Sequence, residues 1–183
     1  MLVSGREAVR ILRRRGGITG EAQARSLLRS GLAGSGVITD TGLYFDRDAV
    51  RALADRPWLD ESAQQAACPA GAYIARLPRA DPPDLTRPWA DVVDRLDRVP
   101  RMPAMTVALL DVSVSAGGRL PWVATLDGFV VVGADLLGLT VGDDGSNRFR
   151  LERPGEWFEV WRGARLRGSR GGRPWIVRRP RAA

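Results

Sequence analysis

Carboxylates are the side chains with which this sequence could support acid–base chemistry. Asp111, Asp127 and Asp135 lie in its most apolar part, and paired carboxylates can act as general acid and general base. The chain contains no His and no Lys, which excludes Ser-His-Asp catalysis, Cys-His catalysis and zinc sites that need His. Asp127 precedes Gly128, a pair that favours a tight turn. We therefore expect no enzyme activity, no cofactor and no metal, and keep a three-aspartate site as the enzymatic alternative.

Cys68 and a polar loop offer two further kinds of chemistry. Cys68 is the only cysteine, so no disulfide can form within the chain, and a cytoplasmic location is the compatible expectation. Residues 143–147 read Asp-Asp-Gly-Ser-Asn, and bound calcium is the alternative to a solvated turn. The loop lacks the alternating oxygen ligands and the distal Glu of an EF-hand, so we expect a turn.

Arginine is the remaining side chain with chemistry to offer. All 28 basic residues are Arg, and the net charge is +7. Residues 1–57 hold 10 Arg against 6 acidic residues, residues 58–147 hold 7 against 12, and residues 148–183 hold 11 against 3. The codon bias of a GC-rich genome explains much of the arginine content, but not two basic ends around an acidic middle. Attraction to a polyanion explains that distribution.

Two helices are predicted in the basic N-terminal part. Ser4 and Glu7 match a capping box, so the first helix begins there, and Gly16-Gly17 end it. Thr19 is the predicted N-cap of a second helix that runs to Ser30. Apolar residues recur at helical spacing in both segments, so each helix has one buried face.

A hairpin and a third helix follow. Residues 37–38 and 43–45 predict two short strands around a turn at residues 39–42. Asp46 is placed to cap a third helix, which Pro57 ends.

This order of elements resembles the MerR-like and excisionase-like winged helix-turn-helix domains over roughly residues 2–57. The residues that carry the resemblance are Glu7-Ala8-Val9 with Ile11-Leu12, Leu27-Leu28-Arg29-Ser30-Gly31-Leu32, and Tyr44-Phe45-Asp46-Arg47-Asp48-Ala49-Val50 with Leu53. Two features depart from the family pattern. The linker at residues 13–17 is longer than the usual tight turn, and Gly20-Glu21-Ala22 stands where basic or hydroxyl side chains are usual.

The resemblance implies that the helix at residues 19–30 enters the major groove of DNA. Arg25 or Arg29 would then bond guanine, Gln23 would meet adenine, and Ser26 would serve either. Arginines of the first helix and residues of the wing would hold phosphates. The residues that we expect at DNA are Arg6, Arg10, Arg13, Thr19, Gln23, Arg25, Ser26, Arg29 and Thr41. The alternative for each arginine is a solvated helix face.

The rest of the chain predicts a separate body of mixed structure. Short helices are expected at residues 61–67, 88–99, 135–139 and 154–161. Strands are expected at residues 72–77, 106–115, 121–126, 129–132 and 149–151, with residues 106–132 forming three antiparallel strands. The predicted fold class is α+β: a small winged helix-turn-helix head (residues 1–59) followed by a mostly antiparallel β body with a few short helices (residues 60–183).

The basic C-terminal end has three interpretations. Residues 165–181 carry seven arginines around Trp175-Ile176-Val177. They form a last strand with a solvated tail, or an additional grip on DNA phosphates, or an RNA contact in which tryptophans stack on bases.

These observations favour a DNA-binding protein, with transcription regulation as the leading hypothesis. We expect double-stranded DNA as the partner, a homodimer that reads two half-sites, and a body that binds a second copy, an effector or another protein. No signal peptide and no membrane-spanning stretch is evident, so we expect no membrane partner. The alternatives are an accessory recombination or architectural DNA-binding protein, and a protein-interaction module whose head no longer binds DNA.

Overall fold

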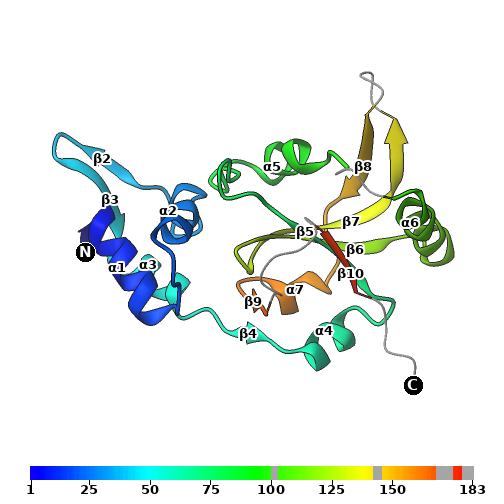
Figure 1. The fold of residues 1–183 in the computed structure, drawn as a ribbon, viewed down its shortest axis with the longest axis horizontal. Helices are drawn as coiled ribbons and strands as arrows, with labels where there is room; N and C mark the ends of the chain where they lie inside the picture. Colours follow the sequence, from blue (N-terminus) through cyan, green and yellow to red (C-terminus); the bar gives the residue numbers. More distant parts are fainter. Residues whose placement is uncertain (100–102, 142–145, 168–174, 179–183) are drawn as a thin grey trace.

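The computed structural model describes residues 1–99, 103–141, 146–167 and 175–178. Within these residues the chain has seven helices and two β-sheets, so the predicted α+β class is confirmed. Figure 1 shows a small unit of α1, α2, α3 and a three-stranded sheet at one end, and a larger unit around a curled mixed sheet at the other.

The N-terminal unit, called the head below, comprises residues 1–57. Its elements are β1 (Leu2–Ser4), α1 (Gly5–Arg15), α2 (Glu21–Arg29), β2 (Val37–Thr39), β3 (Gly42–Asp46) and α3 (Arg47–Ala54). The three strands pair antiparallel in the order β1-β3-β2. The short strand β1 was not predicted, and it places Val3 opposite Phe45. The hairpin of β2 and β3 projects from the helices as a wing-like extension (Figure 1).

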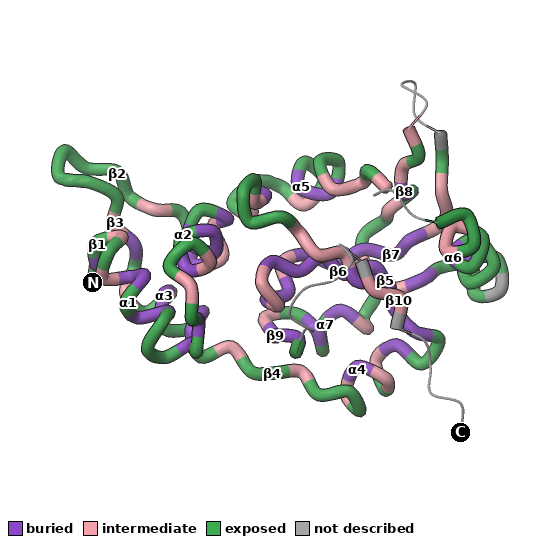
Figure 2. Tube along the Cα trace, in the orientation of Figure 1, coloured by how far each residue is buried: buried purple, intermediate pink, exposed green. Residues whose placement is uncertain are grey.

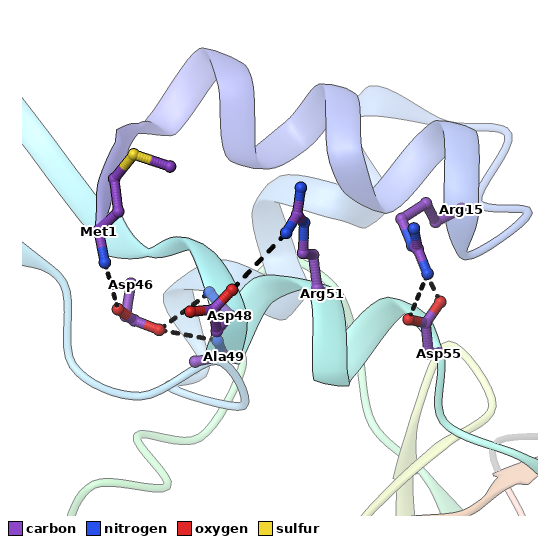
Figure 3. A network of polar contacts seen from close by, with 7 residues as sticks. All are labelled: Met1, Arg15, Asp46, Asp48, Ala49, Arg51 and Asp55. Carbon is purple, nitrogen blue, oxygen red and sulfur yellow. Dashed lines mark hydrogen bonds and ion pairs between the residues drawn. The ribbon is translucent and has the colours of Figure 1, made fainter.

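Side-chain caps fix the starts of α1 and α3. Ser4 Oγ accepts from the Glu7 backbone N–H at 3.3 Å, which confirms the predicted N-cap of α1. Asp46 Oδ1 accepts from the backbone N–H groups of Asp48 and Ala49, both at 2.9 Å (Figure 3). These caps satisfy amide groups that have no partner within the helix.

An ion pair ties the C-terminal ends of α1 and α3 together. The Arg15 guanidinium donates to both carboxylate oxygens of Asp55, at 3.1 and 2.7 Å (Figure 3). Hydrogen bonds from Arg15 lower the pKa of Asp55, and the charge of Arg15 acts in the same direction. The buried faces of the two helices meet above Phe45 of the small sheet, with Leu12 and Leu53 fully enclosed.

The start of α2 differs from the prediction. Gly20, not Thr19, occupies the N-cap position, and no side chain caps the helix. The first helical hydrogen bond runs from the Ala24 N–H to the Gly20 carbonyl oxygen at 3.2 Å. Thr19 therefore lies one residue too early for its hydroxyl to cap the helix, and its predicted N-cap role is wrong.

The second unit, called the body below, is built on a seven-stranded sheet. Its elements are β4 (Trp58–Leu59), α4 (Glu61–Ala67), β5 (Ala72–Arg76), α5 (Trp89–Leu96), α6 (Ala104–Gly117), β6 (Leu120–Leu126), β7 (Phe129–Val141), β8 (Asn147–Glu152), α7 (Phe158–Trp161), β9 (Arg165–Leu166) and β10 (Trp175–Arg178). The strand order is β10-β5-β6-β7-β9-β4, with β8 paired to β7. The pairs β5–β6 and β4–β9 are parallel and the others are antiparallel, so the sheet is mixed.

The hairpin of β6 and β7 is as predicted at its turn but longer than predicted. Asp127 and Gly128 have φ values of 53° and 86°, the left-handed geometry that a two-residue hairpin turn requires. The strand β7 continues to Val141, so the predicted helical turn at residues 135–139 is wrong. Asp135 remains in a buried strand because Arg119 and Trp157 donate to its carboxylate, at 2.9 and 2.7 Å.

The predicted strand at residues 106–115 is wrong, because these residues belong to helix α6. Gly118 ends the helix in left-handed geometry with φ of 72°. Leu110 and Val114, four residues apart, pack on the sheet, while Met105 and Val112 are 72% and 64% exposed. The prediction failed for two reasons. Apolar side chains lie on both faces of α6, so the sequence shows no helical periodicity. The segment also contains several Val residues, which favour strands over helices.

Helices cover both faces of the large sheet. Packing of α5 and α6 encloses Trp122, Ala124 and Leu136, while α4 and α7 lie over a second cluster that contains Val123 and Val130. These buried segments run through the centre of the body in Figure 2. Of the predicted helices, α4 and α5 are confirmed, and α7 is confined to the last turn of the predicted segment.

The head and the body share one hydrophobic core. Leu126 and Phe129, at the tip of the β6–β7 hairpin, are fully buried in the cluster formed by α1, α2 and α3. The predicted strand at residues 149–151 is confirmed as β8, and residues 175–178 form β10. Most of the predicted loop at residues 143–147, and the arginines at positions 170, 173, 179 and 181, lie outside the described residues.

Candidate nucleic-acid interface

A groove of about 1800 Å³ runs along the head between α1, α2 and the β2–β3 hairpin. Its floor is apolar and includes Val9, Ile18 and Leu28, which belong to the core of the head. Arg79 and Ala80, from the connection between β5 and α5, complete one side. The groove is therefore formed mainly by the head, with a small contribution from the body.

Arginines dominate the charge of this groove. Those on its lining are Arg6, Arg10, Arg13, Arg14, Arg25, Arg29 and Arg79. Among the described residues that line it, Glu21 is the one carboxylate. A concave surface with such an excess of positive charge concentrates polyanions and accelerates their association.

The α1 wall carries four of the arginines on one face. Positions 6, 10, 13 and 14 are separated by four, three and one residues, which places them on one side of a helix. The buried residues Ala8, Ile11 and Leu12 occupy the opposite side. Arg10 is ion-paired with Glu7 one turn earlier, and both side chains remain accessible to solvent.

The α2 wall presents Arg25 and Arg29 one turn apart. Arg25 donates from Nε and Nη2 to Glu21 Oε1, at 3.0 and 2.5 Å. Arg29 Nη2 donates to the Arg79 carbonyl oxygen at 3.3 Å. Both side chains are exposed, and each guanidinium group is held by hydrogen bonds. Contact with a ligand would therefore cost less conformational entropy than it would for a freely moving arginine.

Ser26 does not reach the groove. Its side chain is fully buried, and its hydroxyl donates to the Arg79 carbonyl oxygen at 3.1 Å. The predicted base contact for Ser26 is therefore wrong in this conformation, because a loop distant in sequence covers that face of α2. Gln23 is half-buried at the edge of α2 and is not on the groove lining.

The remaining predicted residues, Thr19 and Thr41, also line the groove. Thr19 lies in the linker before α2, and Thr41 lies at the turn of the β2–β3 hairpin. The Thr41 hydroxyl is hydrogen-bonded to the Tyr44 hydroxyl at 2.9 Å. Of the nine predicted contact residues, the groove brings together Arg6, Arg10, Arg13, Thr19, Arg25, Arg29 and Thr41.

Arg14, Tyr44 and Arg79 are among the groove residues that were not predicted from the sequence. Arg14 has a sequence signal, because it continues the four-residue spacing of Arg6 and Arg10. Arg79 has none, since it follows a strand of the body and lies 50 positions after Arg29.

The connection that carries Arg79 is fixed against the end of α2. The Leu85 N–H donates to the Ser30 carbonyl oxygen at 2.8 Å. Gly31 has a φ of 79°, and a Cβ atom there would lie 2.7 Å from Thr86 Cγ2. The close approach of this loop explains why glycine follows α2.

The three aspartates and the cysteine considered for catalysis do not come together in one site. Asp127 pairs with Arg79 at the hairpin turn, and Asp135, eight residues later on β7, has Arg119 as its partner. Asp111 is exposed on α6. The Cys68 thiol is buried, and desolvation raises its pKa to about 11, which disfavours the reactive thiolate at neutral pH.

The described part of the chain contains no group of three or more His, Cys, Asp or Glu side chains arranged to hold a metal ion. In the same residues, none of the helices combines the length and apolar character needed to cross a bilayer. In comparisons with known proteins, no protein-family model, no curated protein and no solved structure matched the chain significantly.

Proposed function

We propose that the chain binds double-stranded DNA through the arginine-lined groove of its head. The observation that carries the proposal is the convergence of α1 arginines, α2 arginines and the hairpin turn on one concave surface. Phosphate contacts supply most non-specific affinity for DNA, and arginine is suited to them because its planar group donates in pairs. The order β1-α1-α2-β2-β3-α3 supports a winged helix-turn-helix interpretation of the head.

In this proposal α2 is the recognition helix and lies in the major groove. Arg25 and Arg29 project from its exposed face and are the candidates for guanine edges. Glu21 holds Arg25 in place, and a carboxylate there can also accept from a cytosine amino group. Gln23 lies at the edge of α2, outside the groove lining. It could contact adenine only if α2 rotated about its axis when DNA binds.

Phosphate contacts are assigned to α1, to the linker before α2 and to the turn of the β2–β3 hairpin. Arg6, Arg10, Arg13 and Thr19 would hold one strand, and Thr41 at the hairpin turn would hold a flanking phosphate. Such contacts fix the position of a protein on DNA without reading its sequence.

The wider biological role is part of the same proposal. Transcription regulation is the leading role, with an accessory role in recombination as the alternative, and both place the protein in the cytoplasm. One head offers few base contacts, so a homodimer on two half-sites is expected. Light scattering of the purified protein tests the dimer independently of DNA.

A protein-interaction module is the second candidate function. The observation that favours it is the exposure of Ile38, 85% accessible on the β2–β3 hairpin next to Leu43. Binding that depends on such apolar contacts changes little with salt, whereas binding to phosphates weakens steeply.

Two matched arginines test the proposed function. Arg10 on α1 and Arg51 on α3 are each paired with an acidic residue three positions earlier, but only Arg10 lines the groove. We expect Arg10→Ala to weaken binding to every duplex and to lower the salt slope by about 0.9, the value for one phosphate contact. Arg51→Ala should leave affinity unchanged. Equal effects of the two substitutions would contradict the proposed site.

A further inference from the structure

The loop between β5 and α5 brings one arginine of the body to the edge of the groove. Arg79 lines the groove beside the exposed face of α2, and its side chain is 59% exposed. Its Nε donates to Asp127 Oδ1 at 2.5 Å. Among the described residues, the two terminal amino groups of this guanidinium have no partner. They are available to a ligand in the groove.

Asp127, the acidic partner of Arg79, is buried rather than exposed. Its side chain is only 7% exposed, and its Oδ2 atom is buried without a hydrogen-bond partner among the described residues. It occupies the turn of the β6–β7 hairpin, whose flanking residues Leu126 and Phe129 are enclosed in the core of the head. The carboxylate is therefore anchored rigidly below Arg79 rather than free in solvent.

The backbone of Arg79 is held as well. Its carbonyl oxygen accepts from Ser26 Oγ at 3.1 Å and from Arg29 Nη2 at 3.3 Å. The position of Arg79 is thus set by α2 on one side and by the hairpin of the body on the other.

We propose that Arg79 makes a DNA phosphate contact supplied by the body, and that Asp127 is the positioning residue that aims its guanidinium at the groove. This inference rests on the proposed DNA-binding function. Arginine binds phosphate through paired N–H donors, and the Nε contact with Asp127 leaves such a pair free. The negative charge of Asp127 also competes with the phosphate, so the same carboxylate that orients Arg79 limits its attraction for DNA.

Asp127 can be replaced by Asn without disturbing the geometry of the hairpin turn. Asn-Gly is the favoured pair for a two-residue hairpin turn with left-handed geometry, so Asp127→Asn suits the backbone. The amide carbonyl oxygen can still accept from Arg79 Nε, while the competing charge is removed. Arg79→Gln removes the positive charge and keeps an amide donor for the buried carboxylate, and Arg79→Lys keeps the charge.

The experiment compares wild type, Arg79→Gln, Arg79→Lys, Asp127→Asn and the double variant Arg79→Gln with Asp127→Asn. Binding to a random GC-rich duplex is measured by fluorescence anisotropy over a range of salt. Arg79→Gln should bind about three- to tenfold more weakly, with a salt slope lower by about 0.9, and Arg79→Lys should recover part of the loss. Asp127→Asn should bind about two- to fivefold more tightly, and this gain should vanish in the double variant.

A gain from Asp127→Asn that persists without Arg79 would show a general charge effect and overturn the inference. Wild-type affinity and slope for Arg79→Gln would overturn it as well. Absence of duplex binding by the wild-type protein is a different outcome, because it contradicts the proposed function itself. Thermal unfolding of each variant confirms that the proteins compared are folded.

Discussion

The guanidinium of Arg165 donates to the backbone carbonyl oxygen of Gly16 at 2.8 Å, and both residues are buried. Gly16 is the C-cap of α1, where carbonyl groups point out of the helix and favour a positive charge. The same guanidinium lies 4.1 Å from the ring centroid of Trp58 and 4.4 Å from that of Phe129. A residue 149 positions away thus connects the groove-forming helix to the body.

Replacement of Arg165 should weaken the contact between the head and the body and so destabilise the protein. Arg165→Ala removes a buried charge-assisted hydrogen bond and two cation–π contacts, and we expect a loss of about 2–4 kcal/mol in the free energy of unfolding. Urea denaturation measures it. Arg162→Ala is the control, because Arg162 is exposed and pairs with Glu159 three residues earlier. Equal stability of the two variants would contradict the role of Arg165.

Gly133 should tolerate no side chain. A Cβ atom at this position of β7 would overlap the ring of Phe158, which α7 holds in place. Gly133→Ala should therefore destabilise the body by about 1–3 kcal/mol through overpacking. Gly117→Ala is the matched control, since a Cβ atom on that helical residue meets nothing within 4 Å. If thermal unfolding shows both variants to be as stable as wild type, the packing of α7 on β7 is not as described.

Local chemistry decided which elements could be predicted from the sequence. Asp46 before α3 and Asp127-Gly128 between β6 and β7 act within a few residues, so their effects were visible in the sequence. Helix α6 was misassigned because its apolar residues lie on both faces and no helical period remains. The choice between helix and strand there depends on packing against the sheet, which local preferences do not contain.

The candidate interface was predictable to the extent that it lies on single helices. Arg6, Arg10 and Arg13, which the resemblance implied as DNA contacts, lie on one face of α1 and line the groove. Ser26 was assigned wrongly and Arg79 was missed for one shared reason: the loop that covers Ser26 carries Arg79 and comes from the body. A contact between segments 53 positions apart leaves no periodic signal in either segment.

Substitution of the α2 arginines should abolish sequence discrimination. Arg25→Ala combined with Arg29→Ala removes both candidate base contacts, each of which is worth about 1–3 kcal/mol of discrimination. A selected site and a random duplex should then be bound equally, and more weakly than wild type binds the site. Competition binding after site selection measures the ratio. An unchanged preference for the selected site would contradict the assignment of α2 as the recognition helix.

Lowering the pH should destabilise the folded head by protonating Asp46. Its pKa lies below the ordinary value of 3.8, mainly because the Ala49 backbone N–H donates to the carboxylate. A depressed folded pKa contributes stability that is present above the unfolded pKa and is lost as the pH falls through the folded pKa. The loss should therefore begin near pH 4 and increase below it.

The Asp46→Asn variant isolates this effect, because asparagine can cap α3 but does not titrate. Between about pH 5 and pH 3 the urea midpoint of wild type should fall further than that of Asp46→Asn. Parallel decreases in the two proteins would assign the acid sensitivity to other carboxylates, such as Asp55 or Asp60, whose pKa values are also lowered.

Binding of the wild-type protein to nucleic acid tests the central claim most directly. Fluorescence anisotropy is measured with a random GC-rich duplex from low to physiological salt, beside single-stranded RNA of equal length. We predict duplex binding that is several-fold tighter than RNA binding and that weakens steeply with salt, as expected when several groove arginines displace counterions. Absence of duplex binding at low salt would contradict the DNA-binding function and favour a protein partner.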